Sequence, residues 1–172
     1  MKTLATCSDG TKIEAPRWYR NQQRLAEFQR KRKPRKVRKL HAKIANRRLD
    51  FLHKEPTNLV NDRELIVVGD VSSSKLTKTT MAKSVNDAGW SMFRHLLEYK
   101  AIARKVAYRE VSERFTTQAC SCRGAMGGPK GRKGLEIREW VCDECGAVLD
   151  RDVNAALNIL RLGHQSLLAE GR

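Results

Sequence analysis

Two pairs of cysteines constrain this chain more than any other feature. Cys120 and Cys122 are separated by one residue, nineteen residues follow, and Cys142 and Cys145 are separated by two. Two thiol pairs joined by a loop can surround one tetrahedral ion, which is the ligand set of a structural zinc site. We therefore predict a zinc ribbon whose ligands are Cys120, Cys122, Cys142 and Cys145.

The first cysteine pair departs from the usual spacing of such a site. Two residues usually separate the thiols and a glycine follows, but here Arg123 stands where the second ligand is expected, before Gly124. Either Cys122 shifts by one place and still binds, or the site is distorted and weak. Two surface thiol pairs or a disulfide remain the alternatives, and the sequence leaves them open.

The overall charge points to a polyanionic partner. The 172 residues include 35 Lys and Arg against 19 Asp and Glu, which gives a net charge of +16. Such an excess is typical of proteins that bind nucleic acid. The sequence has neither an apolar run of about 18 residues nor a signal-peptide pattern, so we expect a cytoplasmic protein without a membrane partner.

A dense cluster of basic residues lies between positions 30 and 39. Eight of these ten residues are Lys or Arg, and few acids are close enough to pair with them. Contact with phosphates is favoured over a solvated helix face or a flexible linker, and it would not read sequence. The predicted nucleic-acid contacts are Arg30, Lys31, Arg32, Lys33, Arg35, Lys36, Arg38 and Lys39, with Lys130, Arg132 and Lys133 between the cysteine pairs.

The first part of the chain is expected to contain a hairpin and a long helical segment. Residues 3–14 suggest two short strands around Asp9-Gly10, because that dipeptide supplies the turn that a hairpin needs. Apolar residues at three- and four-residue spacings predict helix from residue 17 to about 57. Pro34 should break or kink this segment.

The remainder of the chain alternates further strands with helices. The apolar, largely β-branched run at 65–68 predicts a buried strand, residues 88–105 predict a helix and residues 106–111 another strand. Asp152 is the expected N-cap of a final helix that ends at Gly163. These elements predict an α/β protein with the zinc ribbon inserted before its last helix.

Several segments of the chain together form a specific pattern. In the C-terminal half they are residues 116–120 (TTQAC), 137–142 (IREWVC), 145–146 (CG) and 150–159 (DRDVNAALNI). Further upstream, residues 47–54, 82–84, 89–90 and 97–100 belong to the same pattern. Together they closely resemble the C-terminal part of the TnpB (OrfB) proteins of bacterial insertion sequences, over essentially the whole chain. The resemblance implies an RNA-guided DNA endonuclease, similar to small type V CRISPR effectors. Its partners would be DNA and a guide RNA, with no small-molecule substrate, and its RuvC-like, RNase H-type domain would be interrupted by the zinc ribbon.

The resemblance also implies three catalytic carboxylates that hold two Mg²⁺ ions for phosphodiester hydrolysis. The third maps onto Asp152, but Gly69 occupies the position of the second, and the strand that bears the first would precede Leu4. Asp70 is not a substitute, because adjacent residues of a strand face opposite sides. With one carboxylate of three, we expect neither productive Mg²⁺ binding nor nuclease activity. For Asp152, a role as the N-cap of the last helix is at least as well supported as a catalytic role.

Three parts of the chain follow from this resemblance. Residues 1–115 would be a partial RuvC-like domain with a basic helical segment at 17–57, residues 116–150 the zinc ribbon, and residues 151–172 the helix that completes the RuvC-like domain. Without its first strand, the RNase H-like sheet would be incomplete and marginal, while the helices and the ribbon persist.

The sequence favours a truncated, nuclease-inactive TnpB-type protein that retains nucleic-acid binding. A transposase label would then describe lineage rather than activity. The alternative is a non-enzymatic, zinc-dependent DNA- or RNA-binding protein such as a repressor. A functionless fragment, or a start codon placed too far downstream, is a third hypothesis.

Overall fold

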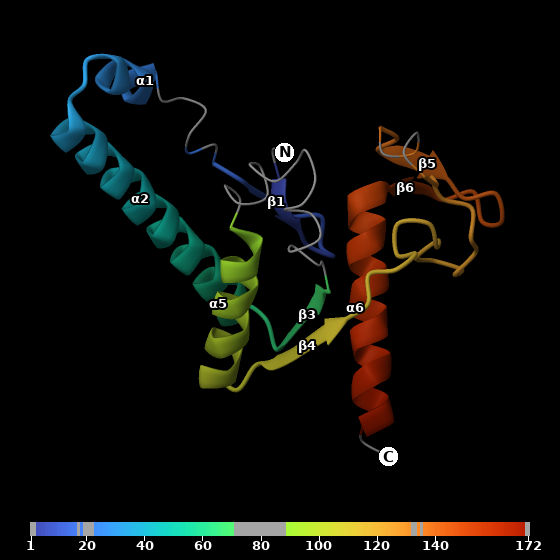
Figure 1. The fold of residues 1–172 in the computed structure, drawn as a ribbon. Helices are drawn as coiled ribbons and strands as arrows, with labels where there is room; N and C mark the ends of the chain where they lie inside the picture. The colour runs from blue at the N-terminus through green and yellow to red at the C-terminus, as the bar shows by residue number, and fades with distance from the viewer. Residues whose placement is uncertain are drawn as a thin grey trace. The chain divides into compact units, whose positions relative to one another are not determined.

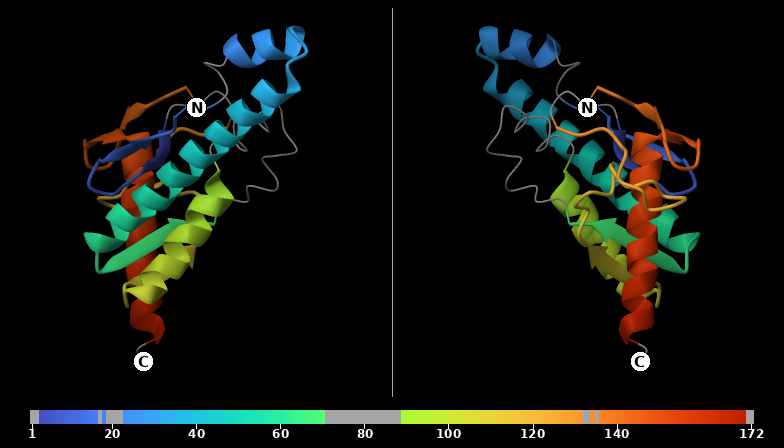
Figure 2. Two further views of the ribbon diagram at one scale, coloured as in Figure 1. Left: turned by 90° about the vertical axis from the view of Figure 1, so that its left-hand side faces the viewer. Right: turned by 90° about the vertical axis from the view of Figure 1, so that its right-hand side faces the viewer.

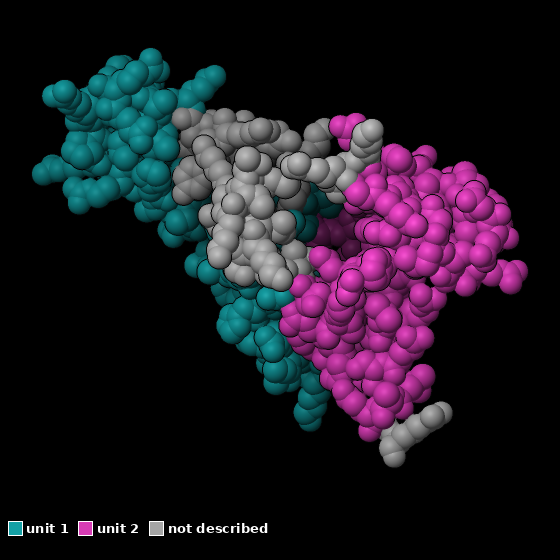
Figure 3. Space-filling view, turned by 45° about the vertical axis from the view of Figure 1, so that its right-hand side comes forward, with its two compact units in different colours: residues 1–4, 14–64, 72–106 teal, residues 5–13, 65–71, 107–172 magenta. Residues whose placement is uncertain are grey.

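The computed structural model describes residues 3–16, 18, 23–70, 89–131, 134 and 136–170. The chain divides into two compact units, shown in Figure 3. Unit 1 comprises residues 1–4, 14–64 and 72–106, and unit 2 comprises residues 5–13, 65–71 and 107–172. Arg132 and Lys133, two of the predicted phosphate contacts, lie outside the described residues.

Unit 1 is dominated by two helices that pack side by side. Helix α2 (Pro34–Asn61) contacts α5 (Trp90–Ala103), as Figures 1 and 2 show, and the short helix α1 (Gln23–Arg30) precedes α2. Pro34 occupies the first turn of α2, where its missing N–H costs no hydrogen bond. The predicted break is therefore confirmed. The buried apolar residues of these two helices are Ile44, Leu52, Val60, Phe93, Leu96, Leu97 and Ala101.

Helix α2 passes through Pro56 and extends beyond the predicted end near residue 57. A proline within a helix removes one backbone donor and strains the preceding turn. Here the carbonyl oxygen of His53 accepts hydrogen bonds from Thr57 Oγ1 at 2.8 Å and from Lys100 Nζ of α5 at 3.1 Å. Side chains thus reinforce α2 near the proline and tie it to α5.

The predicted hairpin and the other predicted strands are confirmed. Strands β1 (Thr3–Thr6) and β2 (Lys12–Glu14) pair with each other, and Gly10 adopts a φ of +86° in their turn. Strand β3 (Leu65–Gly69) pairs in parallel with β4 (Ala107–Val111). Strand β5 (Glu139–Val141) pairs antiparallel with β6 (Val148–Asp150).

Helix α6 (Arg151–Glu170) packs against β3 and β4 within unit 2. The predicted end at Gly163 is wrong, because the helix continues to Glu170. A Cβ at Gly163 would collide with the side chain of Val67 on β3. This glycine therefore permits close approach of a helix to a strand, and it does not terminate the helix.

The N-cap of α6 is also two residues earlier than predicted. Asp150 Oδ1 accepts hydrogen bonds from the backbone N–H groups of Asp152 at 2.9 Å and Val153 at 3.0 Å, so Asp150 is the cap and Asp152 lies in the first turn. Lys12 Nζ is 2.8 Å from Asp150 Oδ2. The hydrogen bond from Lys12, with those from the two backbone N–H groups, lowers the pKa of Asp150.

The described strands form three separate two-stranded sheets, β1-β2, β3-β4 and β5-β6. This arrangement confirms a mixed α/β fold. The incomplete RNase H-like sheet, and the division at residues 115 and 150, stay predictions. Among the described helices, none is both long and apolar enough to cross a membrane.

Candidate metal centre and nucleic-acid interface

The two cysteine pairs lie in turns with the same backbone geometry. Cys120 O accepts a hydrogen bond from Gly124 N at 2.7 Å, and Cys142 O accepts one from Gly146 N at 2.8 Å. The φ angles of the two glycines are +80° and +68°. Glycine adopts such angles without the steric penalty of a Cβ. Both turns therefore close with the same hydrogen bond and a left-handed glycine, although their thiols are spaced differently.

The displaced thiol of Cys122 still reaches its neighbours. The sulfurs of Cys120, Cys122 and Cys145 lie within 4.8 Å of one another, and those of Cys120 and Cys145 are 3.7 Å apart. Two thiolates bound to a tetrahedral zinc at about 2.3 Å would be about 3.8 Å apart. This trio therefore fits a metal ion. Cys142 lies outside the trio, but its thiol influences the pKa of both Cys120 and Cys145.

The thiols of Cys120 and Cys145 differ in pKa. Burial acts to raise the pKa of Cys120, but hydrogen bonds from the backbone N–H groups of Arg123 and Cys122 and from the neighbouring thiols lower it to about 7. The backbone N–H of Ala147 acts to lower the pKa of Cys145, but burial and the neighbouring thiols raise it to about 11. The interactions among these thiols therefore favour one thiolate in the group, and the thiolate is the form that binds metal.

A small apolar core supports the cysteine turns. Trp140 and Leu149 face each other across the β5-β6 pair. Both side chains are buried with Cys120 and Cys142, which are 0% and 1% exposed. The two cysteines that begin the turns are therefore fixed by packing, whereas Cys122 is exposed.

Two asparagines of α6 hold the segment that leads into the first cysteine turn. The side-chain amides of Asn154 and Asn158 each donate to the carbonyl oxygens of Thr116 and Ala119, at 2.7–3.2 Å. Asn154 Oδ1 also accepts the backbone N–H of Ser121 at 2.8 Å. Both side chains are almost fully buried. The sequence analysis missed them, although a spacing of four residues places them on one helix face.

Asp152, the predicted catalytic acid, is half-exposed and forms an ion pair. Its Oδ2 lies 3.3 Å from Arg138 Nη1, and Arg138 O accepts the backbone N–H of Arg151. Within the described ranges, the cysteine trio is the one group of three side chains that could hold a metal. Among the described residues, Asp152 does not form a metal-binding group with two other acids.

Glu113 fills the space beside Gly69 at the end of β3. A Cβ at Gly69 would lie 3.1 Å from both Cβ and Oε2 of Glu113. The backbone N–H of Glu113 donates to Asp70 Oδ1 at 3.1 Å. Burial, and then the negative charge of Asp70, raises the pKa of Glu113. A carboxyl group from the segment after β4 thus lies in tight contact with the point where a side chain at position 69 would begin.

The basic cluster lies at the junction of α1 and α2. Its eight side chains are exposed, from Arg30 at the end of α1 to Lys39 in the second turn of α2. In the described part of the chain, one residue of this cluster forms an ion pair: Lys31 Nζ lies 2.7 Å from Glu27 Oε1. The hydrogen bond from Lys31 lowers the pKa of Glu27. Lys36 Nζ also lies 5.5 Å from the centre of the Phe28 ring. Lys130, in unit 2, is exposed.

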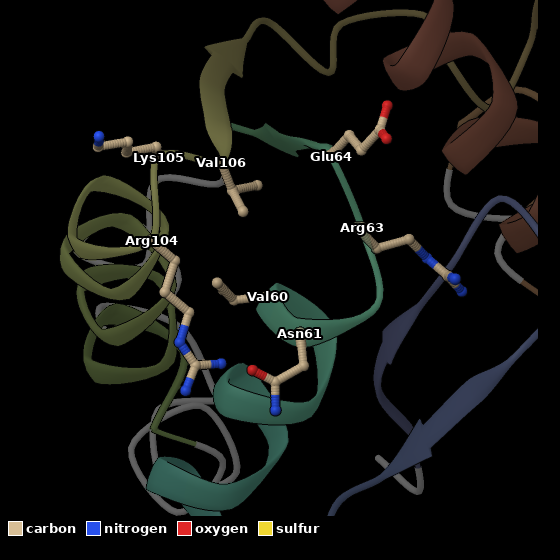
Figure 4. Close-up of a pocket in the computed structure, with 7 residues that line it drawn as sticks. All are labelled: Val60, Asn61, Arg63, Glu64, Arg104, Lys105 and Val106. Atoms are coloured by element: carbon tan, nitrogen blue, oxygen red, sulfur yellow. The ribbon is translucent and has the colours of Figure 1, made fainter.

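Unit 1 also contains an open pocket of about 500 Å³ near the C-terminal ends of α2 and α5, shown in Figure 4. No predicted site residue contributes to its lining. The lining residues are Val60, Asn61, Arg63, Glu64, Arg104, Lys105 and Val106.

Two family models match most of the chain. Residues 1–80 match OrfB of IS605, described as "Probable transposase", and residues 90–159 match the Cas12f1-like TNB domain. A protein of Streptomyces pristinaespiralis named "Putative RNA-guided DNA endonuclease" is 40% identical over 94% of this chain and 43% of its own length. A protein of Escherichia coli K12 named "Putative RNA-guided DNA endonuclease InsQ" is 31% identical over 95% of this chain and 47% of its own length. The chain thus spans about half the length of these curated relatives.

Solved structures show the same likeness at the level of the fold. A Cas12f1 in complex with single guide RNA and target DNA superposes with a TM-score of 0.64 and 17% identity, over 87% of this chain and 43% of that one. The mini RNA-guided endonuclease CRISPR-Cas_phi3 superposes with a TM-score of 0.53 and 14% identity, over 89% of this chain and 25% of that one. The sequence and fold matches confirm the resemblance: this chain is related to the TnpB (OrfB) proteins.

Proposed function

We propose that this chain binds nucleic acid through the basic cluster of α1 and α2 and does not cleave it. The observation that carries the proposal is the set of eight exposed cations within ten residues, with one recorded ion pair among the described residues. The relatives are named RNA-guided DNA endonucleases, so DNA and a guide RNA are the proposed partners.

The shape of this cluster suits a phosphate backbone. Arg35 and Lys39 are exposed on successive turns of α2, so their positions along the helix axis differ by about 6 Å. Cations spaced in this way can each contact a phosphate without contacting base edges. Binding of this kind releases counterions and weakens steeply with salt.

The region around Gly69 supports the absence of cleavage. The resemblance implies a carboxylate at this position, but Glu113 already occupies the adjacent space, and Asp152 is ion-paired with Arg138. Hydrolysis by two Mg²⁺ ions needs several carboxylates that converge on both ions. Asp152 alone does not supply that set, so any Mg²⁺ is proposed to bind unproductively.

We further propose that the cysteines hold a structural zinc. Cys120, Cys122 and Cys145 have the required sulfur separations. Cys142 is the proposed fourth ligand because it begins the second cysteine turn and its thiol influences the pKa of Cys120 and Cys145. A bound zinc would join the two cysteine turns without taking part in a reaction. On this view residues 116–150 form the ribbon, and the parts around it are RuvC-like.

The binding proposal is tested with two doubly substituted chains that lose the same charge. Arg35→Gln with Lys39→Gln removes two cluster cations, whereas Lys54→Gln with Arg104→Gln removes exposed cations elsewhere, one of them paired with Asp50. Affinity for labelled DNA is measured at several salt concentrations. The first pair should reduce the slope of log K against log salt by about 2, and the control by less. Equal reductions would refute the assignment of the cluster.

A further inference from the structure

Phe115 has a backbone conformation that its residue type rarely adopts. Its φ is +66°, and among the described non-glycine residues only Arg32 and Lys105 share a positive φ, at +47° and +60°. Those two residues lie just after α1 and α5, where a left-handed residue commonly ends a helix. Phe115 instead follows strand β4, in the segment that leads to the first cysteine turn (Figure 1).

The surrounding hydrogen bonds hold this unfavourable conformation in place. Phe115 O accepts the backbone N–H groups of Gln118 at 2.9 Å and Ala119 at 3.0 Å. Thr116 donates from both N and Oγ1 to Glu113 O, and its own carbonyl oxygen accepts from the two buried asparagines of α6. Strain that the neighbouring structure maintains in this way is concentrated at functional sites.

The Phe115 ring that this backbone presents is open to solvent on part of its surface. The residue is 49% exposed, and the guanidinium of Arg114 lies 4.7 Å from the ring centre. A stacked guanidinium and an exposed aromatic ring together form a surface on which a planar ring can stack. An exposed apolar ring offers a phosphate no hydrogen bond, whereas the flat face of a base matches it.

We propose that Phe115, flanked by Arg114, stacks against an unpaired base of single-stranded nucleic acid. The inference rests on the proposed nucleic-acid binding and adds a specific contact in unit 2. Bases within a duplex are already stacked on each other, so a ring of this kind selects single strands. A base stacks on Phe115 irrespective of its identity, because every base has a π face.

Three substitutions at Phe115 test the inference in the full chain. Leu keeps the apolar bulk without a π face, Gly relieves the positive φ without a side chain, and Trp restores a stacking ring. Each variant is titrated, by fluorescence anisotropy, with labelled oligothymidylate and with an abasic phosphodiester strand of equal length. Phe115→Leu and Phe115→Gly should weaken oligothymidylate binding about tenfold and leave abasic binding unchanged, while Phe115→Trp retains both.

A matched control and a folding measurement complete the test. Lys105→Gly changes the other left-handed residue of comparable φ, and it should leave the difference between the two oligonucleotides unchanged. Thermal melts followed by circular dichroism identify a variant that fails to fold. If Phe115→Gly does so, Phe115→Leu still decides the question, because it retains most of the buried side-chain surface.

The possible failures are distinguishable. If the unsubstituted chain binds neither oligonucleotide, the proposed function fails and this inference fails with it. If it binds oligothymidylate and the folded Phe115→Leu chain binds equally tightly, only the stacking inference is overturned. Equal losses for both oligonucleotides would also overturn it, since the ring would then support the fold or contact another class of partner.

Discussion

The first cysteine turn and the end of strand β3 each depart from the family pattern, with opposite consequences. In the turn, the second thiol is displaced by one residue, yet Cys122 remains within 4.8 Å of Cys120 and Cys145. At the end of β3 an acid follows Gly69 by one residue, but adjacent strand residues point to opposite faces. A glycine-closed turn therefore keeps a shifted thiol close to its neighbours, whereas a strand directs a shifted carboxylate to the opposite face.

The largest expected effect concerns the metal that we propose for the cysteine turns. Cys120→Ser should lower the affinity for Co²⁺, a spectroscopic substitute for zinc, at least about a hundredfold and make unit 2 sensitive to protease, because structural zinc contributes directly to folding. Cys122→Ser should cause a smaller loss, since this exposed thiol is held less firmly. Co²⁺ absorption titrations check both. Unchanged affinity in Cys122→Ser would show that the displaced thiol is not a ligand.

The next largest effect concerns the asparagine contacts to the first turn. Asn158→Ala leaves buried carbonyl oxygens without one of their donors and should reduce the free energy of unfolding by about 2 kcal/mol. Asn154→Ala should also weaken Co²⁺ binding, because Asn154 alone accepts the N–H of Ser121. Urea unfolding and Co²⁺ titration are the measurements. As a control, Gln165→Ala on exposed α6 surface should change neither.

A third prediction tests whether the β3 region can be repaired. Gly69→Glu should destabilise the chain by about 1–3 kcal/mol, because its side chain enters the space of Glu113. It should not produce Mg²⁺-dependent cleavage. Adding Glu113→Ala should recover part of the lost stability, as urea unfolding would show. If Gly69→Glu alone were as stable as the parent and cleaved DNA, the structural contrast with the cysteine turn would be wrong.

The smallest effect is expected at the cap of α6. Asp150→Ala should reduce the free energy of unfolding by about 1 kcal/mol at neutral pH. The pKa of Asp150 is lowered in the folded chain, mainly by Lys12, so its charged form contributes stability above the unfolded pKa of about 3.9. That contribution is lost as pH falls through the folded pKa. The difference between Asp150→Asn and the parent should therefore shrink in acid; a constant difference would contradict this.

Local sequence signals predicted the elements well but not the contacts between them. The hairpin around Gly10, the start of α2 at Pro34 and strands β3 and β4 follow from turn chemistry, proline geometry and apolar patterns. Gly163 was interpreted as a helix end because glycine ends many helices, but its role depends on Val67, 96 residues away in the chain. Asp150 and Asp152 are equally good caps by type, and the structure was needed to distinguish them.

The candidate sites show the same limit. Spacing predicted the cysteine group and composition predicted the exposed basic cluster, because both are local properties. The asparagine contacts and the packing of Glu113 beside Gly69 depend on tertiary structure. The strained, exposed ring of Phe115 had no sequence signal, since a phenylalanine after a strand usually reads as a core residue.

The most direct test of the central claim is to follow one labelled DNA for both binding and integrity in the presence of Mg²⁺. A native gel measures the bound fraction, and a denaturing gel of the same sample measures cleavage. We expect a salt-sensitive complex in which the DNA remains intact. Mg²⁺-dependent cleavage that disappears in Asp152→Ala would contradict the account, because it would show that Asp152 is part of a working nuclease site.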